Sequence, residues 1–104
     1  AVKNNVQLPY IPAEATNNAH MFYMVCSSLE QRTRIIDKLK KSDVLAVFHY
    51  LSLHKSPFYM EKHDKRDLPN TDKYADCLVR LPMYYELEDS QIDNIIDLIV
   101  NTYE

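Results

Sequence analysis

The sequence contains no glycine, and this absence excludes whole classes of functional site. At the average usage of about 7%, a chain of this length would carry about seven glycines. Dinucleotide-binding fingerprints and phosphate-cradling loops need glycine wherever the backbone takes a positive φ angle or closely approaches a ligand. A free-standing Rossmann or P-loop enzyme is therefore excluded.

Cysteine and clustered basic residues are also scarce. The 2 cysteines, Cys26 and Cys77, are too few and too far apart for a secreted disulfide scaffold, so we expect reduced thiols in a cytoplasmic protein. The formal net charge is -3, and the one dense basic run, at 38–41, falls at a predicted helix end. Both observations argue against nucleic acid as a partner. No apolar run approaches the roughly 18 residues of a membrane span, so we expect no membrane partner.

The residues that are present predict one small domain preceded by an arm. The chain has 104 residues, of which 46% are hydrophobic, and this suffices for one ordinary core. Residues 1–19 are polar and contain Pro9 and Pro12, so they predict an extended linker or arm, and residues 20–104 predict the domain. Because the chain starts at Ala1 in such a segment, we expect a piece of a longer protein.

Two apolar runs, 20–26 and 44–50, predict strands, with the first at the centre of the sheet. Between them, Ser27 and Ser28 each offer a capping box that starts a helix. This helix carries one apolar stripe, formed by Leu29, Ile35, Ile36 and Leu39. It ends near Asp43, since Asp tolerates the left-handed conformation that follows many helices.

The second half of the chain predicts two further helices. The first follows Pro69 and carries a buried stripe formed by Tyr74, Cys77, Leu78 and Leu81. A short edge strand at 81–85 comes next, because proline is tolerated at strand ends and edges. The last helix follows 88–90 and has an apolar face formed by Ile92, Ile95, Ile96, Ile99 and Tyr103. Leu98 and Val100 widen this face, either as ordinary exposed residues or as a contact with a second domain or subunit.

Together these elements predict a two-layer α/β (α+β) domain, with helices mainly on one face of a small sheet. The segment 51–69 contains two prolines, two histidines and a charge run, and it predicts a long loop. Loops of this length inside a small domain are usually functional or disordered. The loop is therefore the first place to look for a site.

Histidine is the commonest metal ligand and general base, and His49, His54 and His63 fall in or beside this loop. Their spacing does not match a zinc site, which needs two close ligand pairs, so we expect no metal. The cysteines lie on apolar elements, where a thiol is usually inert. The acidic residues at 86–89 favour helix capping over acid–base catalysis, and His20 favours a place in the core or at its rim.

Four segments resemble, in order, the C-terminal part of the DegT/DnrJ-type sugar aminotransferases. They are Asn-Ala-His-Met-Phe-Tyr at 18–23, Ala-Val-Phe-His-Tyr at 46–50, Leu-His at 53–54 with Pro57, and Arg-Leu-Pro-Met at 80–83. The resemblance implies the small C-terminal domain, with a mainly antiparallel sheet, of an aspartate-aminotransferase-like fold. It also implies a dimeric enzyme that depends on pyridoxal 5'-phosphate (PLP).

By this resemblance, the whole enzyme transfers an amino group from glutamate to a nucleotide-linked keto sugar, a dTDP-4-keto-6-deoxy sugar of bacterial surface-polysaccharide synthesis. The family's cofactor lysine lies in the large domain, and no segment here resembles that site. We therefore expect no catalytic residue and no PLP on this chain, and no activity from the chain alone. The resemblance assigns substrate contact to His49, Tyr50 and His54, although His54 has a bracing role as its alternative.

Two positions depart from the family pattern, since Ser52 stands where proline is common and Asp43 where glycine is common. The first departure affects the expected shape of the loop, and the second is compatible with a helix end. A competing interpretation is a stand-alone, non-enzymatic α/β module. Such a module would bind a metabolite or a protein partner through the exposed face of the last helix.

Overall fold

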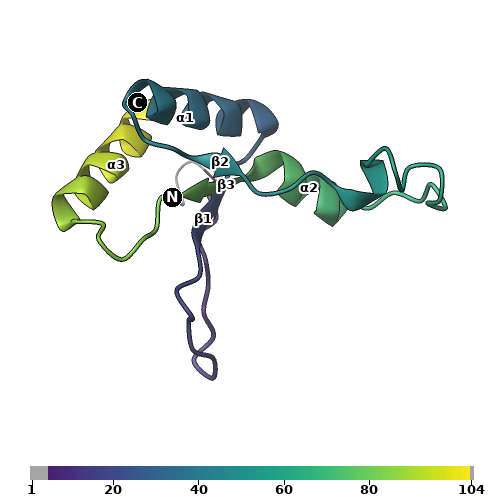
Figure 1. Ribbon diagram of the computed structural model, residues 1–104, viewed down its shortest axis with the longest axis horizontal. Coiled ribbons are helices and arrows are strands. Elements are labelled where there is room, and N and C mark those ends of the chain that lie inside the picture. Colours follow the sequence, from purple (N-terminus) through teal and green to yellow (C-terminus); the bar gives the residue numbers. More distant parts are fainter. Residues whose placement is uncertain (1–4, 104) are drawn as a thin grey trace.

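The computed structural model describes residues 5–103 and contains a three-stranded antiparallel sheet with three α-helices (Figure 1). The strand order is β1 (Phe22–Val25), β3 (Leu78–Leu81), β2 (Val47–Phe48). Both outer strands pair with β3, which brings Met24 opposite Val79. The predicted α/β class with a small antiparallel sheet is confirmed. Residues 1–4 of the predicted arm lie outside the described residues.

Helix α1 (Leu29–Lys41) begins and ends where its sequence predicts. Ser28 is the N-cap, and its hydroxyl accepts a hydrogen bond from the Gln31 backbone N–H at 3.1 Å. Basic residues occupy the last turn, where they stabilise the negative end of the helix dipole. Asp43 follows with a φ of 61°, so an aspartate adopts the left-handed turn that glycine usually provides.

The core lies between α1, α3 (Asp89–Thr102) and one face of the sheet. Cross-strand partners point to the same side of a sheet, so Met24 and Val79 face the helices together. Ile35 and Leu39 of α1 meet them, and all four side chains are buried. Figure 1 shows α1 running along the sheet, with α3 beside its C-terminal end.

The prediction for residues 69–85 is wrong in two respects. Helix α2 (Pro69–Cys77) ends four residues early, and Leu78–Leu81 form β3, the central strand. The spacing of the apolar residues in this stretch fits a helix as well as a strand. Pairing with β1 selects the strand, and this pairing begins with a 2.8 Å hydrogen bond from the Cys26 N–H to the Cys77 carbonyl. The predicted edge strand at 81–85 is absent from the described chain, because Pro82 ends the pairing.

Three smaller predictions also need correction. The strand predicted at 20–26 is shorter and lies at an edge of the sheet. The run at 44–50 contributes only Val47 and Phe48 to β2, and both are partly exposed. On α3, Leu98 packs against the core, whereas the exposed apolar positions share one outward stripe, formed by Ile92, Ile96 and Val100. Helix α3 turns Ile95 toward the core, so its exposed apolar face is formed by a different set of residues from the one that the sequence predicts.

Two long excursions leave this packed region (Figure 1). Residues 8–21, most of which belong to the predicted arm, project beyond β1 after Gln7 has paired with Val25. The site loop, residues 49–68, runs from β2 to α2 and contains one 3-10 turn, η2 (Leu53–Lys55). None of the helices found within residues 5–103 is both long enough and apolar enough to cross a membrane.

Candidate functional site

The root of the site loop is held by Arg32 of α1. Its guanidinium donates a hydrogen bond to the Ala75 carbonyl of α2 at 2.8 Å and lies 5.4 Å from the centroid of the Phe48 ring. Phe48 directly precedes the loop, and α2 directly follows it. One partly buried contact network therefore fixes both ends of the loop against the helix that covers the sheet.

Asp72, in the first turn of α2, gathers three polar groups of the loop. Its Oδ1 accepts a hydrogen bond from the Ser52 hydroxyl at 3.3 Å, pairs with the Lys55 ammonium at 3.2 Å and lies 3.3 Å from His54 Nε2. Desolvation alone would raise the pKa of Asp72, but the hydrogen bond and charge of Lys55, with His54 and Ser52, lower it below its usual value of 3.8. The ionised carboxylate thus fixes the position of η2.

The three residues assigned to substrate contact lie in two groups. His49 and Tyr50 touch edge to face, with ring centroids 4.4 Å apart, and the Tyr50 side chain is 71% exposed. His54 instead belongs to the Asp72 network, and its side chain is only 11% exposed. Tyr50 thus presents its phenol at the surface, whereas His54 is mostly buried beside Asp72.

A tight turn at 63–66 closes the far end of the loop. His63 Nε2 lies 3.1 Å from the Arg66 carbonyl, and Asp64 Oδ1 accepts from the Arg66 N–H at 3.1 Å. Lys65 takes a φ of 64° to make this turn. The turn places His63 against His54, with ring centroids 5.2 Å apart. A hollow of about 360 Å³, named here the loop hollow, opens beside this pair.

Sequence patterns did not reveal Asp72, Ser52 or Arg32 as parts of this site. Asp72 has the signature of an acidic first-turn residue, which needs no partner beyond its helix. Its contact with Ser52 spans 20 positions and exists only because α2 folds back beside the loop. The one available signal was Ser52 itself, a polar residue within an apolar run, and it is buried.

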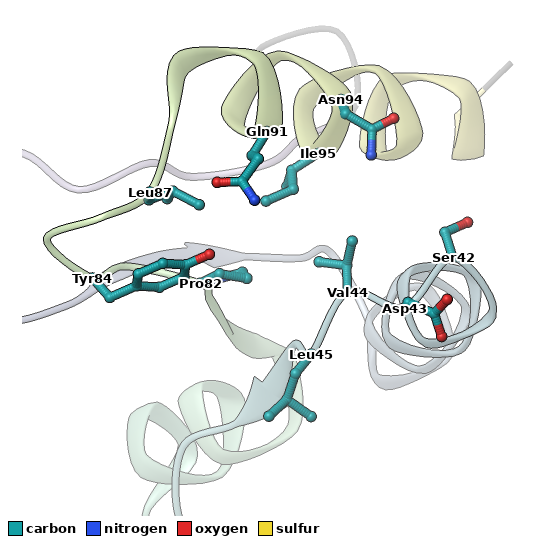
Figure 2. A pocket seen from close by; sticks show the side chains of 10 residues that line it. All are labelled: Ser42, Asp43, Val44, Leu45, Pro82, Tyr84, Leu87, Gln91, Asn94 and Ile95. Carbon is teal, nitrogen blue, oxygen red and sulfur yellow. The ribbon is translucent and has the colours of Figure 1, made fainter.

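A second hollow, of about 520 Å³, lies away from the loop, between α3 and the segments that follow α1 and β3 (Figure 2). Val44 points toward α3 from one side, Gln91 and Ile95 of α3 face it, and Leu45 also lines the hollow. Among the described residues that line it, Asp43 is the one with a charged side chain. The hollow therefore offers no acid–base pair, and the titratable groups gather in the site loop instead.

Comparison with known proteins agrees with this architecture. A model of the DegT/DnrJ/EryC1/StrS aminotransferase family matches residues 1–100, which is nearly the whole chain. The chain belongs to this family. An uncharacterized protein of Methanocaldococcus jannaschii is 33% identical over 70 residues, which are 65% of this chain and 17% of that protein.

Solved structures of aminotransferases share the fold. An aminotransferase from Streptoalloteichus hindustanus matches with a TM-score of 0.83 and 21% identity, over 96% of this chain and 26% of its own. NtdA from Bacillus subtilis, with bound PMP, matches with a TM-score of 0.79 and 21% identity, over 97% of this chain and 23% of its own. PseC from Helicobacter pylori, an aminotransferase of pseudoaminic acid biosynthesis, matches with a TM-score of 0.72 and 19% identity, over 81% of this chain and 23% of its own. The chain thus spans about a quarter of the length of these structures.

The family implies PLP, but the described residues do not fit its site. PLP enzymes hold the cofactor with a lysine and place an acidic residue at the pyridine nitrogen. Lys55 is mostly exposed and engaged by Asp72, Lys62 lies on the Phe58 ring, and Lys73 lies near the Tyr74 ring. The remaining described lysines are in the site loop's turn or in the last turns of α1. Within residues 5–103, no group of three or more His, Cys, Asp or Glu could hold a metal ion.

Proposed function

We propose that this chain is part of a PLP-dependent sugar aminotransferase, and that residues 20–104 are its small C-terminal domain, with residues 1–19 as a connecting arm. The family match over residues 1–100 carries the proposal. PLP, when bound, supplies the electron sink for amino transfer. This chain contributes the site loop, not the cofactor lysine.

The proposed substrate is a nucleotide-linked keto sugar, with glutamate as the amino donor. Within the family, the segments at 18–23 and 46–50 most resemble dTDP-4-amino-4,6-dideoxygalactose transaminase, so we favour a dTDP-4-keto-6-deoxy sugar. The enzyme would then be cytoplasmic and serve bacterial cell-surface polysaccharide synthesis. The participation of the related PseC in pseudoaminic acid biosynthesis supports a sugar substrate.

His49, Tyr50 and His54 carry substrate recognition in this proposal. The exposed Tyr50 hydroxyl donates a hydrogen bond to the sugar, and His49 packs against the Tyr50 ring and sets its orientation. His54, locked by Asp72, holds the loop in position for this contact. The hydroxyl of a phenol and the nitrogens of an imidazole suit sugar hydroxyl groups well.

Exposed surface supports the proposed partners, which are a large PLP domain and a second subunit. The chain exposes 8231 Å². A compact monomer of its mass would expose about 6,100 Å². The excess of about 2,100 Å² is more than the roughly 800 Å² that one partner contributes to a standard protein–protein interface. Much of it is apolar and lies on the arm and the site loop, at Tyr10, Leu51, Leu53 and Phe58.

The test is an amino-transfer assay on the native gene product, with dTDP-4-keto-6-deoxyglucose and glutamate. Tyr50→Phe should raise the KM for the sugar nucleotide roughly tenfold, the effect of losing one hydrogen bond to substrate, with little change in kcat. Tyr85→Phe, which removes a hydroxyl from an even more exposed ring outside the loop, is the control.

The outcomes separate the parts of this proposal. An unchanged KM in Tyr50→Phe would remove Tyr50 from the binding site while leaving the activity in place. A gene product that transfers no amino group to any nucleotide-linked keto sugar would overturn the function and favour the non-enzymatic binding module.

A further inference from the structure

The charged side chains that line the loop hollow are basic. Lys62 and Arg66 line it together with His54 and His63, and the hydroxyls of Tyr59 and Thr71 add two more donors. None of the described residues that line it is acidic, although the whole chain has a net charge of -3. Leu53 and Leu68 complete its wall. A hollow of about 360 Å³ with this lining is large enough for a small ligand and favours an anion.

The two permanent cations are positioned but not neutralised. The Lys62 ammonium lies 3.7 Å from the centroid of the Phe58 ring, and this cation–π contact orients the charge without cancelling it. Arg66 Nε lies 3.5 Å from Asp64 Oδ2, and both side chains are well exposed. An exposed pair at this distance is weak, so the other guanidinium donors stay available.

Backbone geometry holds these groups in one place. The left-handed Lys65 and the bond between His63 and the Arg66 carbonyl close the turn that carries Arg66. His54, which also lines the hollow, is held by Asp72. The hollow therefore has its shape before a ligand arrives, which reduces the ordering that binding requires.

We propose that the loop hollow binds a diphosphate group through Lys62 and Arg66. This inference rests on the proposed function in taking the diphosphate from the nucleotide-linked sugar. A guanidinium forms paired, charge-assisted hydrogen bonds to phosphate oxygens, and an ammonium supplies a compact second charge. The hydroxyls of Tyr59 and Thr71 complete the donor set.

Another cationic hollow, near the C-terminal end of α1, serves as a comparison. It has a volume of about 610 Å³ and is lined by Arg34, Lys38 and Lys41. Asp37 lines it as well, and its lining residues include no imidazole. Its fixed charges sum to the same net value as those of Lys62 and Arg66, so the two imidazoles of the loop hollow are what favour that hollow as the anion site.

The experiment is a calorimetric titration of the native gene product with inorganic pyrophosphate. The double variant K62M/R66M should bind pyrophosphate at least about tenfold more weakly, because two charge-assisted contacts are lost. Asp64→Asn removes the carboxylate that competes for Arg66, so it should bind about two- to threefold more tightly. K40M/K73M, with the same charge change outside the hollow, should leave the affinity unchanged.

Each result supports or overturns the inference. Absence of pyrophosphate binding to the unaltered protein, or equal losses in K62M/R66M and K40M/K73M, would overturn it. Stronger binding of orthophosphate than of pyrophosphate would identify a single-phosphate site and overturn the diphosphate assignment.

A separate measurement of amino transfer by K62M/R66M distinguishes this inference from the proposed function. If K62M/R66M transfers amino groups with an unchanged KM for the sugar nucleotide, the function stands and the diphosphate site fails. If pyrophosphate binding depends on Lys62 and Arg66 but no amino transfer occurs, the site stands and the function fails.

Discussion

The packed region and the site loop of this protein are stabilised by different contacts. Around α1, the side chains that meet the sheet are apolar and fully buried, as Ile35, Leu39 and Val79 show. In the site loop, large apolar side chains face outward, and the position of the loop depends on a carboxylate, an imidazole and a hydroxyl. The packed region therefore carries the stability of the fold, whereas the loop holds the proposed substrate contacts.

Two isoleucine substitutions should give the largest difference within this comparison. Ile35→Ala, at a side chain with 0% exposure, should lower the free energy of unfolding by about 2–5 kcal/mol. Ile96→Ala makes the same chemical change on the exposed stripe of α3 and should cost less than about 1 kcal/mol. Urea denaturation of the two variants measures both values. Equal losses would show that the outward stripe of α3 is buried as well.

An intermediate effect is expected from Asp72→Asn, confined to the loop. The pKa of Asp72 is lowered in the folded protein, so its carboxylate stabilises the loop above the usual pKa of 3.8. This contribution is lost as the pH falls through the lowered pKa. At pH 7 the variant should show several-fold faster proteolysis within 49–68, with little change in global unfolding.

The acid dependence supplies the control for this variant. Resonances of Ser52 and His54 should shift below about pH 4 in the unaltered protein through loss of the Asp72 contact, and Asp72→Asn should lack that transition. Asp76→Asn, an exposed change on the same helix, should retain it. A transition that persists in Asp72→Asn would assign the acid sensitivity to another group.

The smallest effect is expected inside the packed region. The Tyr103 hydroxyl is buried beside the Cys26 thiol without a hydrogen bond of ordinary geometry, and burial raises the pKa of the thiol to about 11. Because the hydroxyl loses its hydration on folding and gains little in return, Tyr103→Phe should leave the free energy of unfolding unchanged or raise it by up to about 1 kcal/mol. A loss above about 1 kcal/mol in thermal or urea unfolding would reveal a stronger contact to this oxygen.

The same contrast explains which features the sequence could predict. Local signals placed α1 correctly, because a cap, a stripe and a tolerant Asp43 all lie within the segment they describe. The helix predicted over Leu78–Leu81 is wrong, because the spacing of their apolar residues suits a helix as well as a strand. Only pairing with β1 decides between the two. Non-local contacts of this kind leave no signature within a short window.

The candidate site shows a similar division. His54 is a candidate from the sequence alone, because it is a histidine and its neighbours in the chain predict a loop. Its partner Asp72 lies on a different element, and the contact depends on the angle at which α2 leaves the loop. The predicted substrate contacts at His49, Tyr50 and His54 remain predictions until the assays above are performed.

The left-handed Lys65 has a consequence for the rate at which the loop hollow would capture its proposed ligand. A lysine intrinsically favours a negative φ, so the turn at 63–66 depends on the two contacts that close it. A molecule in which these contacts break leaves the closed shape, and only the closed fraction is ready at an encounter. The rate of capture should then scale with this closed fraction as well as with charge attraction.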